Sequence, residues 1–181
     1  MFGLTMDQFA LLIAPVAALA LLLVIYLTRP GPRRVSGALL GGLFAGTLNL
    51  VLDSAAFSLG LWRYPFTHAA FGPLGFYLAA GLFYGAGMAL IGWRIDRRFG
   101  RRGVLIFLAC FAVYGPLRDY LGSAAASAAG LQFIVFAPGP LAVLADALCW
   151  VGGVGLALAV MRLFAGPARR DRLARQPAAG L

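Results

Sequence analysis

The sequence contains no lysine and no glutamate, and it has one histidine and two cysteines. Every basic side chain is therefore an arginine and every acidic one an aspartate. This excludes a lysine Schiff base and a glutamate general base. His68 is the sole imidazole, so a paired-histidine haem site and a Ser-His-Asp triad are not expected. One histidine among scattered aspartates is also poor spacing for a metal centre, and we expect neither a metal nor another cofactor.

The two cysteines, Cys110 and Cys149, lie inside apolar runs and do not form a Cys-x-x-Cys motif. Cysteine in such a run is usually a small buried hydrophobic residue. We therefore expect two free thiols, with a disulfide between helices as the alternative.

Apolar residues dominate what is present. Of the 181 residues, 62% are hydrophobic and 12% are charged, and the mean hydropathy is +0.89. Runs of about 20 apolar residues are long enough to cross a bilayer as helices. We predict an all-α, polytopic membrane helix bundle over residues 1–166, followed by a basic tail at 167–181. The predicted transmembrane helices cover residues 10–28, 35–61, 74–93, 103–121 and 141–164, and residues 122–139 are expected to be interfacial or re-entrant.

The arginines indicate the orientation of these helices. All but Arg63 and Arg118 lie at 29–34, at 94–102, or from Arg162 to the end of the chain. Cytoplasmic loops are rich in arginine and lysine, so the pattern predicts an external N-terminus and a cytoplasmic C-terminus. The net charge of +9 reports these loops, and no nucleic-acid partner is expected. Small size and short loops suggest a bacterial plasma membrane.

The second predicted helix carries a small and polar stripe. Its spacing alternates between four and three residues, which places the stripe on one helical face. Such a face packs against other helices and turns its carboxylate into the protein. The stripe consists of Gly42, Gly46, Asn49, Asp53, Ala56 and Gly60.

Four predicted helices each place a polar residue at a similar depth. Counting from the cytoplasmic arginines at about 1.5 Å per residue puts these residues roughly 24–28 Å from the inner boundary. They are Asp53, Tyr77, Arg118 and Asp146. Unpaired charges at that depth are costly, so we predict that Arg118 pairs with Asp53 and Asp146. Asp119 points about 100° away from Arg118 and is expected to face the interface.

Two interpretations of this cluster stay open. It either locks the helices together or lines a cavity open to the outer leaflet. In the second case Asp53, Asp146 and Arg118 are the candidate catalytic residues. The candidate substrate-binding residues are Asn49, Trp62, Tyr77 and Tyr84.

The end of the second helix carries the pattern Asp-x6-Gly-x-Trp-x-Tyr, formed by Asp53, Gly60, Trp62 and Tyr64. It resembles the helix end of the small membrane-bound carotenoid and terpenoid ring cyclases. Those enzymes also carry a Pro-x-Glu-Glu signature, which a chain without glutamate lacks. The resemblance covers about twelve residues and does not assign the family.

Three functions are compatible with the sequence. The first is a protein that binds or processes a membrane lipid or isoprenoid in the outer leaflet, with an aspartate exchanging a proton. The second is a small-solute transporter or the substrate-binding subunit of a larger one. The third is a structural subunit that binds a partner, or a second copy, through glycine pairs such as Gly81 and Gly85.

Overall fold

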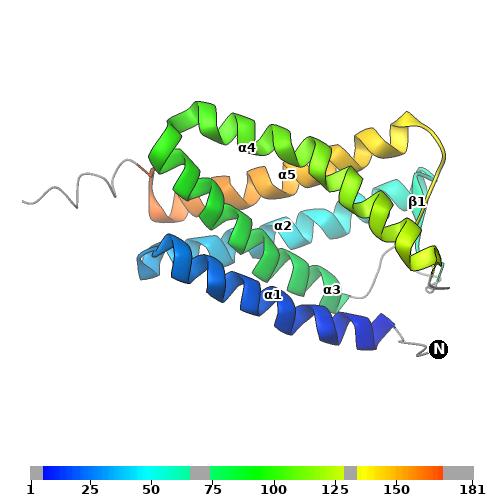
Figure 1. Ribbon diagram of the computed structural model, residues 1–181, viewed down its shortest axis with the longest axis horizontal. Helices are drawn as coiled ribbons and strands as arrows, with labels where there is room; N and C mark the ends of the chain where they lie inside the picture. Colours follow the sequence, from blue (N-terminus) through cyan, green and yellow to red (C-terminus); the bar gives the residue numbers. More distant parts are fainter. Residues whose placement is uncertain (1–5, 66–73, 129–133, 169–181) are drawn as a thin grey trace, which may run out of the picture.

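The computed structural model describes residues 6–65, 74–128 and 134–168. Within them the protein is a bundle of long helices with one short two-stranded ribbon (Figure 1). The elements are α1 (Met6–Thr28), α2 (Pro32–Ser58), β1 (Trp62–Arg63), α3 (Leu74–Ala79), the π-helical η1 (Ala80–Gly85), α4 (Ala86–Ala128), β2 (Val135–Phe136) and α5 (Pro140–Ala165). The predicted all-α class is confirmed.

Among the described residues, three helical segments are long and apolar enough to cross a membrane, which is compatible with the predicted membrane class. They are Pro32–Ser58, Ala80–Ala128 and Pro140–Ala165. In α1 the apolar stretch Ala14–Thr28 is shorter. The predicted number of five transmembrane helices stays a prediction.

Helix α4 reverses direction in its middle. Gly100 has φ 66° and ψ −157° there, a conformation that glycine adopts without the steric penalty of a side chain. In Figure 1 the helix rises from α3 to the upper left and then runs back toward the right of the view. The arginine-rich segment 94–102 surrounds this reversal, so the two halves of α4 correspond to the third and fourth apolar runs of the sequence.

Helix α2 and η1 pack at backbone distance. A Cβ atom at Gly81 would lie 2.3 Å from the Cα of Gly46, and one at Gly42 would lie 2.5 Å from the carbonyl oxygen of Gly81. Only glycine permits such an approach. The stripe of α2 and the Gly81–Gly85 pair therefore meet each other inside one chain.

The end of the bundle that carries the arginine-rich turns is joined by polar contacts. Arg34 is 3% exposed and donates from NH1 to the carbonyl oxygen of Gly166 at 2.6 Å, while its guanidinium lies 5.4 Å from the ring centre of Trp93. Arg162 forms an ion pair with Asp96 at 2.8 Å. These contacts connect the start of α2, the first half of α4 and the end of α5.

The opposite end is closed by the β1–β2 ribbon (Figure 1). Trp62 pairs with Phe136 and Arg63 with Val135 in antiparallel register. Whether residues 122–139 are interfacial or re-entrant stays a prediction, and their described parts belong to two different elements. Residues 122–128 continue α4, because alanine-rich sequence favours a helix, and residues 135–136 form β2.

Candidate functional site

A tight turn after α2 brings the chain back over the end of that helix. Gly60 has φ 68°, and the amide of Leu61 donates to the carbonyl of Ala56 at 2.9 Å. The following strand alternates its side chains, so Trp62 and Tyr64 are buried at 4% and 6% exposure. The pattern of Asp, Gly, Trp and Tyr seen in the sequence is thus one structural unit.

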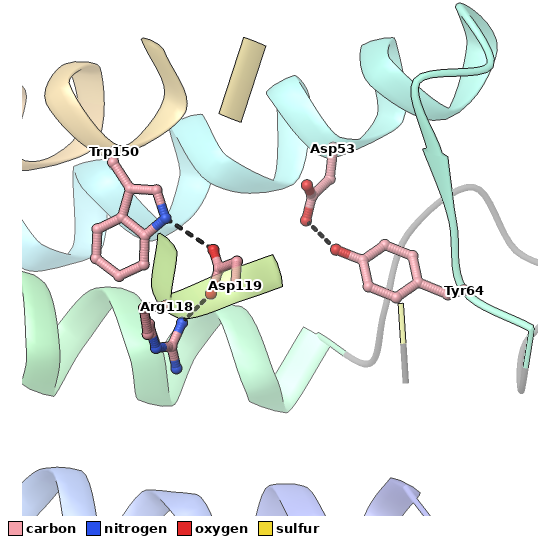
Figure 2. Close-up of polar contacts among 5 residues, drawn as sticks. All are labelled: Asp53, Tyr64, Arg118, Asp119 and Trp150. Carbon is pink, nitrogen blue, oxygen red and sulfur yellow. Dashed lines mark hydrogen bonds and ion pairs between the residues drawn. The ribbon is translucent and has the colours of Figure 1, made fainter. Parts of the chain in front are cut away.

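Asp53 is the hydrogen-bond acceptor at the centre of this unit. Trp62 donates from Nε1 to Oδ1 at 3.1 Å, and the hydroxyls of Tyr64 and Tyr77 donate to Oδ2 at 2.9 Å and 2.5 Å. Figure 2 shows the bond from Tyr64. We call Asp53, Trp62, Tyr64 and Tyr77 the Asp53 clamp. It uses both carboxylate oxygens to tie α2, the β1 segment and α3 together.

Tyr64 lies beyond the end of α2, and its phenol is a permanent donor in the clamp. Burial raises the pKa of Tyr64 well above its ordinary value, and the neighbouring Asp53 carboxylate raises that pKa further. The hydroxyl therefore keeps its proton at physiological pH.

Arg118 does not form the predicted pairs with Asp53 and Asp146. It binds Asp119 from NH1 at 2.5 Å, and its side chain is 53% exposed. Trp150 holds Asp119 from the other side by donating from Nε1 to Oδ2 at 2.8 Å (Figure 2). The expectation that Asp119 faces the membrane interface is wrong, because its carboxylate accepts a hydrogen bond from the Trp150 indole of α5. The adjacent Arg118 binds the other oxygen of the same carboxylate.

Asp146 lies on α5 and is 6% exposed. Its Oδ2 atom is buried and has no hydrogen-bond partner among the described residues, and the same is true of the hydroxyl of Tyr120. Asp146 interacts electrostatically with Tyr120, Asp119 and Asp53. We call Asp53, Asp119 and Asp146 the carboxyl cluster. It joins residues of α2, α4 and α5 at the ribbon end of the bundle.

The ribbon packs over this cluster with aromatic side chains. The ring of Phe136 stacks on Tyr120 with centroids 4.1 Å apart, and it meets Trp62 edge-on at 5.8 Å. Ser123 donates to the carbonyl of Ile134 at 2.6 Å, which fixes β2 to the end of α4. The free thiol of Cys149 on α5 interacts electrostatically with all three members of the carboxyl cluster.

The remaining predicted residues lie around the same region. Asn49 faces α5, where a Cβ atom at Gly153 would lie 3.5 Å from its Oδ1. The ring of Tyr84 meets that of Trp150 edge-on at 5.8 Å. The structure therefore brings Asp53, Trp62 and Tyr77 into direct contact, whereas Tyr84 and Arg118 gather at Trp150.

Sequence reasoning missed four residues of this region as site candidates. Tyr64 belonged to the recognised pattern but was not among the candidate residues. Trp150 lies four residues after Asp146 and thus on the same helical face, which is a signal that could have identified it. Asp119 and Tyr120 follow Arg118 directly, and no spacing rule distinguishes which of the three turns inward.

The described residues contain no group of three histidine, cysteine or acidic side chains that could hold a metal ion. The fold and the site together define a helical protein with helices long and apolar enough to span a membrane, and with acidic and aromatic side chains gathered at one end. Comparison with family models, with characterised proteins and with solved structures gives no match for this chain.

Proposed function

We propose that the chain crosses the plasma membrane of a bacterium five times, with its N-terminus outside and its C-terminus in the cytoplasm. The reversal at Gly100 supports this number, because it divides α4 into two antiparallel halves. The arrangement of the arginine-rich segments supports the orientation. The start of α2, the reversal and the end of α5 lie at the same end of the bundle (Figure 1), as the positive-inside rule requires. The carboxyl cluster is then near the outer face.

We infer that this outer end binds a lipid or an isoprenoid. The observation that carries the proposal is the pair of buried atoms without partners, Oδ2 of Asp146 and the hydroxyl of Tyr120. Buried polar atoms in folded proteins nearly always have a hydrogen-bond partner, so such a pair marks a place for a bound molecule or an ordered water. The polar group of the ligand supplies the missing bonds.

The surroundings favour a ligand that comes from the bilayer. Large apolar side chains next to the cluster on α4 and α5 are exposed, as lipid-facing residues are. They are Leu117 at 56%, Leu121 at 61%, Leu144 at 60% and Leu148 at 71% exposure. An apolar tail lying along this surface would leave its head group at the ribbon end of the bundle, the end at which Asp146 and Tyr120 lie.

The two aspartates then have different roles. Both oxygens of Asp53 already accept hydrogen bonds, so Asp53 positions the turn and Tyr77. Asp146 keeps one oxygen open. It is the residue that would give or take a proton if the bound molecule reacts.

A structural subunit that binds its partner through glycine pairs is less well supported. Those glycines pack against each other within the chain, so a partner would need another surface. The transporter hypothesis stays a prediction.

The test is to identify the bound molecule. The protein is purified in a mild detergent, and organic extracts are analysed by mass spectrometry for lipids and isoprenoids. We expect a stoichiometric species in the wild type that is lost in Asp146→Ala and reduced in Tyr120→Phe. Asp96→Ala removes a carboxylate at the opposite end and serves as the matched control, which retains the species. Equal content in Asp146→Ala and wild type, or no species in either, contradicts the proposal.

A further inference from the structure

We propose that the head group bound at this site is cationic, an amine or a quaternary ammonium carried on an apolar tail. This inference rests on the proposed function, since it names the chemical class of the lipid-like ligand. It follows from the charges, the unused hydrogen-bonding capacity and the aromatic side chains of the site.

The first argument is the balance of charge. Asp146 interacts electrostatically with the acidic side chains of Asp119 and Asp53, and also with the cation Arg118. Arg118 is already bound to Asp119 and is half exposed. The acidic groups therefore outnumber the arginine, and an anionic head group placed among them would be repelled.

The second argument is which atoms remain free to bind. Asp119 uses Oδ1 for Arg118 and Oδ2 for Trp150, and Asp53 uses both oxygens in its clamp. Among the described residues, Oδ2 of Asp146 is the buried oxygen of the cluster without a hydrogen-bond partner, and the residue is only 6% exposed. A carboxylate oxygen accepts hydrogen bonds and attracts positive charge, so its natural ligand is a donor or a cation.

The third argument is the aromatic surface around the cluster. Arg118 lies 5.4 Å from the ring centre of Trp150, so this indole already stabilises one cation through its π face. Further aromatic residues lie beside the acids, and aromatic cages are a common way for proteins to recognise ammonium groups. They are Trp62, Tyr64, Tyr77 and Tyr120.

The preference proposed for this site is opposite in sign to the preference expected from the net charge of the whole chain. A net charge of +9 favours anions at the protein surface in general. A preference for cations that depends on Asp146 would therefore report this site, since the remaining charges act in the opposite direction.

The experiment compares three amphiphiles with the same decyl chain: decyltrimethylammonium, decyl maltoside and decanoate. Each is titrated by calorimetry into full-length protein freed of bound lipid and held in a detergent of longer chain. Wild type, Asp146→Asn and the control Asp96→Asn are compared, after circular dichroism and thermal unfolding confirm that all three are folded. We expect decyltrimethylammonium to bind the wild type about tenfold more tightly than decanoate, and to lose about that factor in Asp146→Asn alone.

The outcomes separate this inference from the proposed function. Comparable binding of all three amphiphiles, weakened together in Asp146→Asn, overturns the cationic head group but leaves the lipid site. Stronger binding of decanoate, or ammonium binding that Asp146→Asn does not change, overturns the inference as well. Absence of saturable binding for every amphiphile overturns both proposals.

Discussion

Asp53 shows how a membrane helix can hold a carboxylate without pairing it to an arginine. Its two oxygens receive one indole N–H and two phenol O–H groups, all from aromatic residues that are themselves buried. Aromatic side chains with a polar tip can bury their rings in apolar surroundings and still solvate a charge. Trp62 and Tyr64, which follow the end of α2, thus donate hydrogen bonds to the carboxylate of Asp53. These bonds fix the geometry of the helix end.

Removing the acceptor of the clamp is expected to be strongly destabilising. In Asp53→Ala three buried donors lose their hydrogen bond to the carboxylate, and each lost bond to a charged group costs about 1.5–3 kcal/mol. Tyr77→Phe removes the bond from one of these donors and should cost less than Asp53→Ala, about 1.5–3 kcal/mol. Both are measured by thermal unfolding in detergent, followed by circular dichroism.

Tyr26→Phe is the matched control for this series, because Tyr26 is 69% exposed on α1. It should leave the unfolding temperature unchanged. An Asp53→Ala protein as stable as the control would show that the clamp contributes nothing to the fold.

For individual residues, the sequence predicts the depth of a side chain along the bundle better than it predicts which residues that side chain contacts. Counting along the helices correctly gathered Asp53 and Tyr77 at one level, and these residues do meet. The same count gave Arg118 the wrong acceptors, because depth says nothing about which acidic side chain is nearest around the helix axis. Asp119 is adjacent in the chain and is held by Trp150, a contact between helices that spacing does not reveal.

Among the elements, α2 and η1 pack at backbone distance. The π-helical segment Ala80–Gly85 lies where Gly81 meets the backbone of Gly46. Single π-helical turns insert one extra residue and often occur at functional positions. Here the segment continues from α3, whose Tyr77 binds Asp53, so close packing of the two backbones also sets the position of the clamp.

A methyl group in this contact is expected to push the two elements apart. Gly81→Ala places a Cβ atom 2.3 Å from the Cα of Gly46, and such overpacking costs about 1–3 kcal/mol. Gly155→Ala on α5 is the control, since a Cβ atom there has nothing within 4 Å. Thermal unfolding of both variants measures the difference in stability. Equal unfolding temperatures would contradict close packing of α2 against η1.

The elements themselves were largely predictable. Apolar runs gave the long helices, since hydrophobicity over about 20 residues is a strong signal. The ribbon was not predicted, because strands of two residues carry no periodic pattern of their own. Its formation depends on Gly60 turning the chain and on Phe136 stacking against Tyr120, and the latter contact is tertiary.

For the whole molecule, the proposed topology makes the two ends of the bundle accessible from opposite sides of the membrane. Arg63 on β1 and Arg98 near the reversal are both exposed. Arg63→Cys and Arg98→Cys are compared in a background with Cys110→Ala and Cys149→Ala. A membrane-impermeant maleimide added to intact cells should label the cysteine at 63 and not the one at 98.

Labelling in inverted membrane vesicles provides the control, because the two positions should exchange their behaviour. Cysteines that react from the same side would contradict the five-helix arrangement.

The agreement between arginine distribution and fold was predictable, since charge at helix ends governs insertion. The contact that joins the start of α2 to the end of α5 could not be predicted, because it depends on a hydrogen bond from Arg34 to the distant Gly166.

That last contact has a consequence for the order in which the protein matures. Arg34 and Gly166 are separated by 132 positions in the chain, so the guanidinium leaves the ribosome long before its carbonyl partner exists. While synthesis continues, it must be accommodated by water or by phosphate groups at the bilayer surface. The arginine-rich end of the bundle can therefore close only after the final helix has been synthesised.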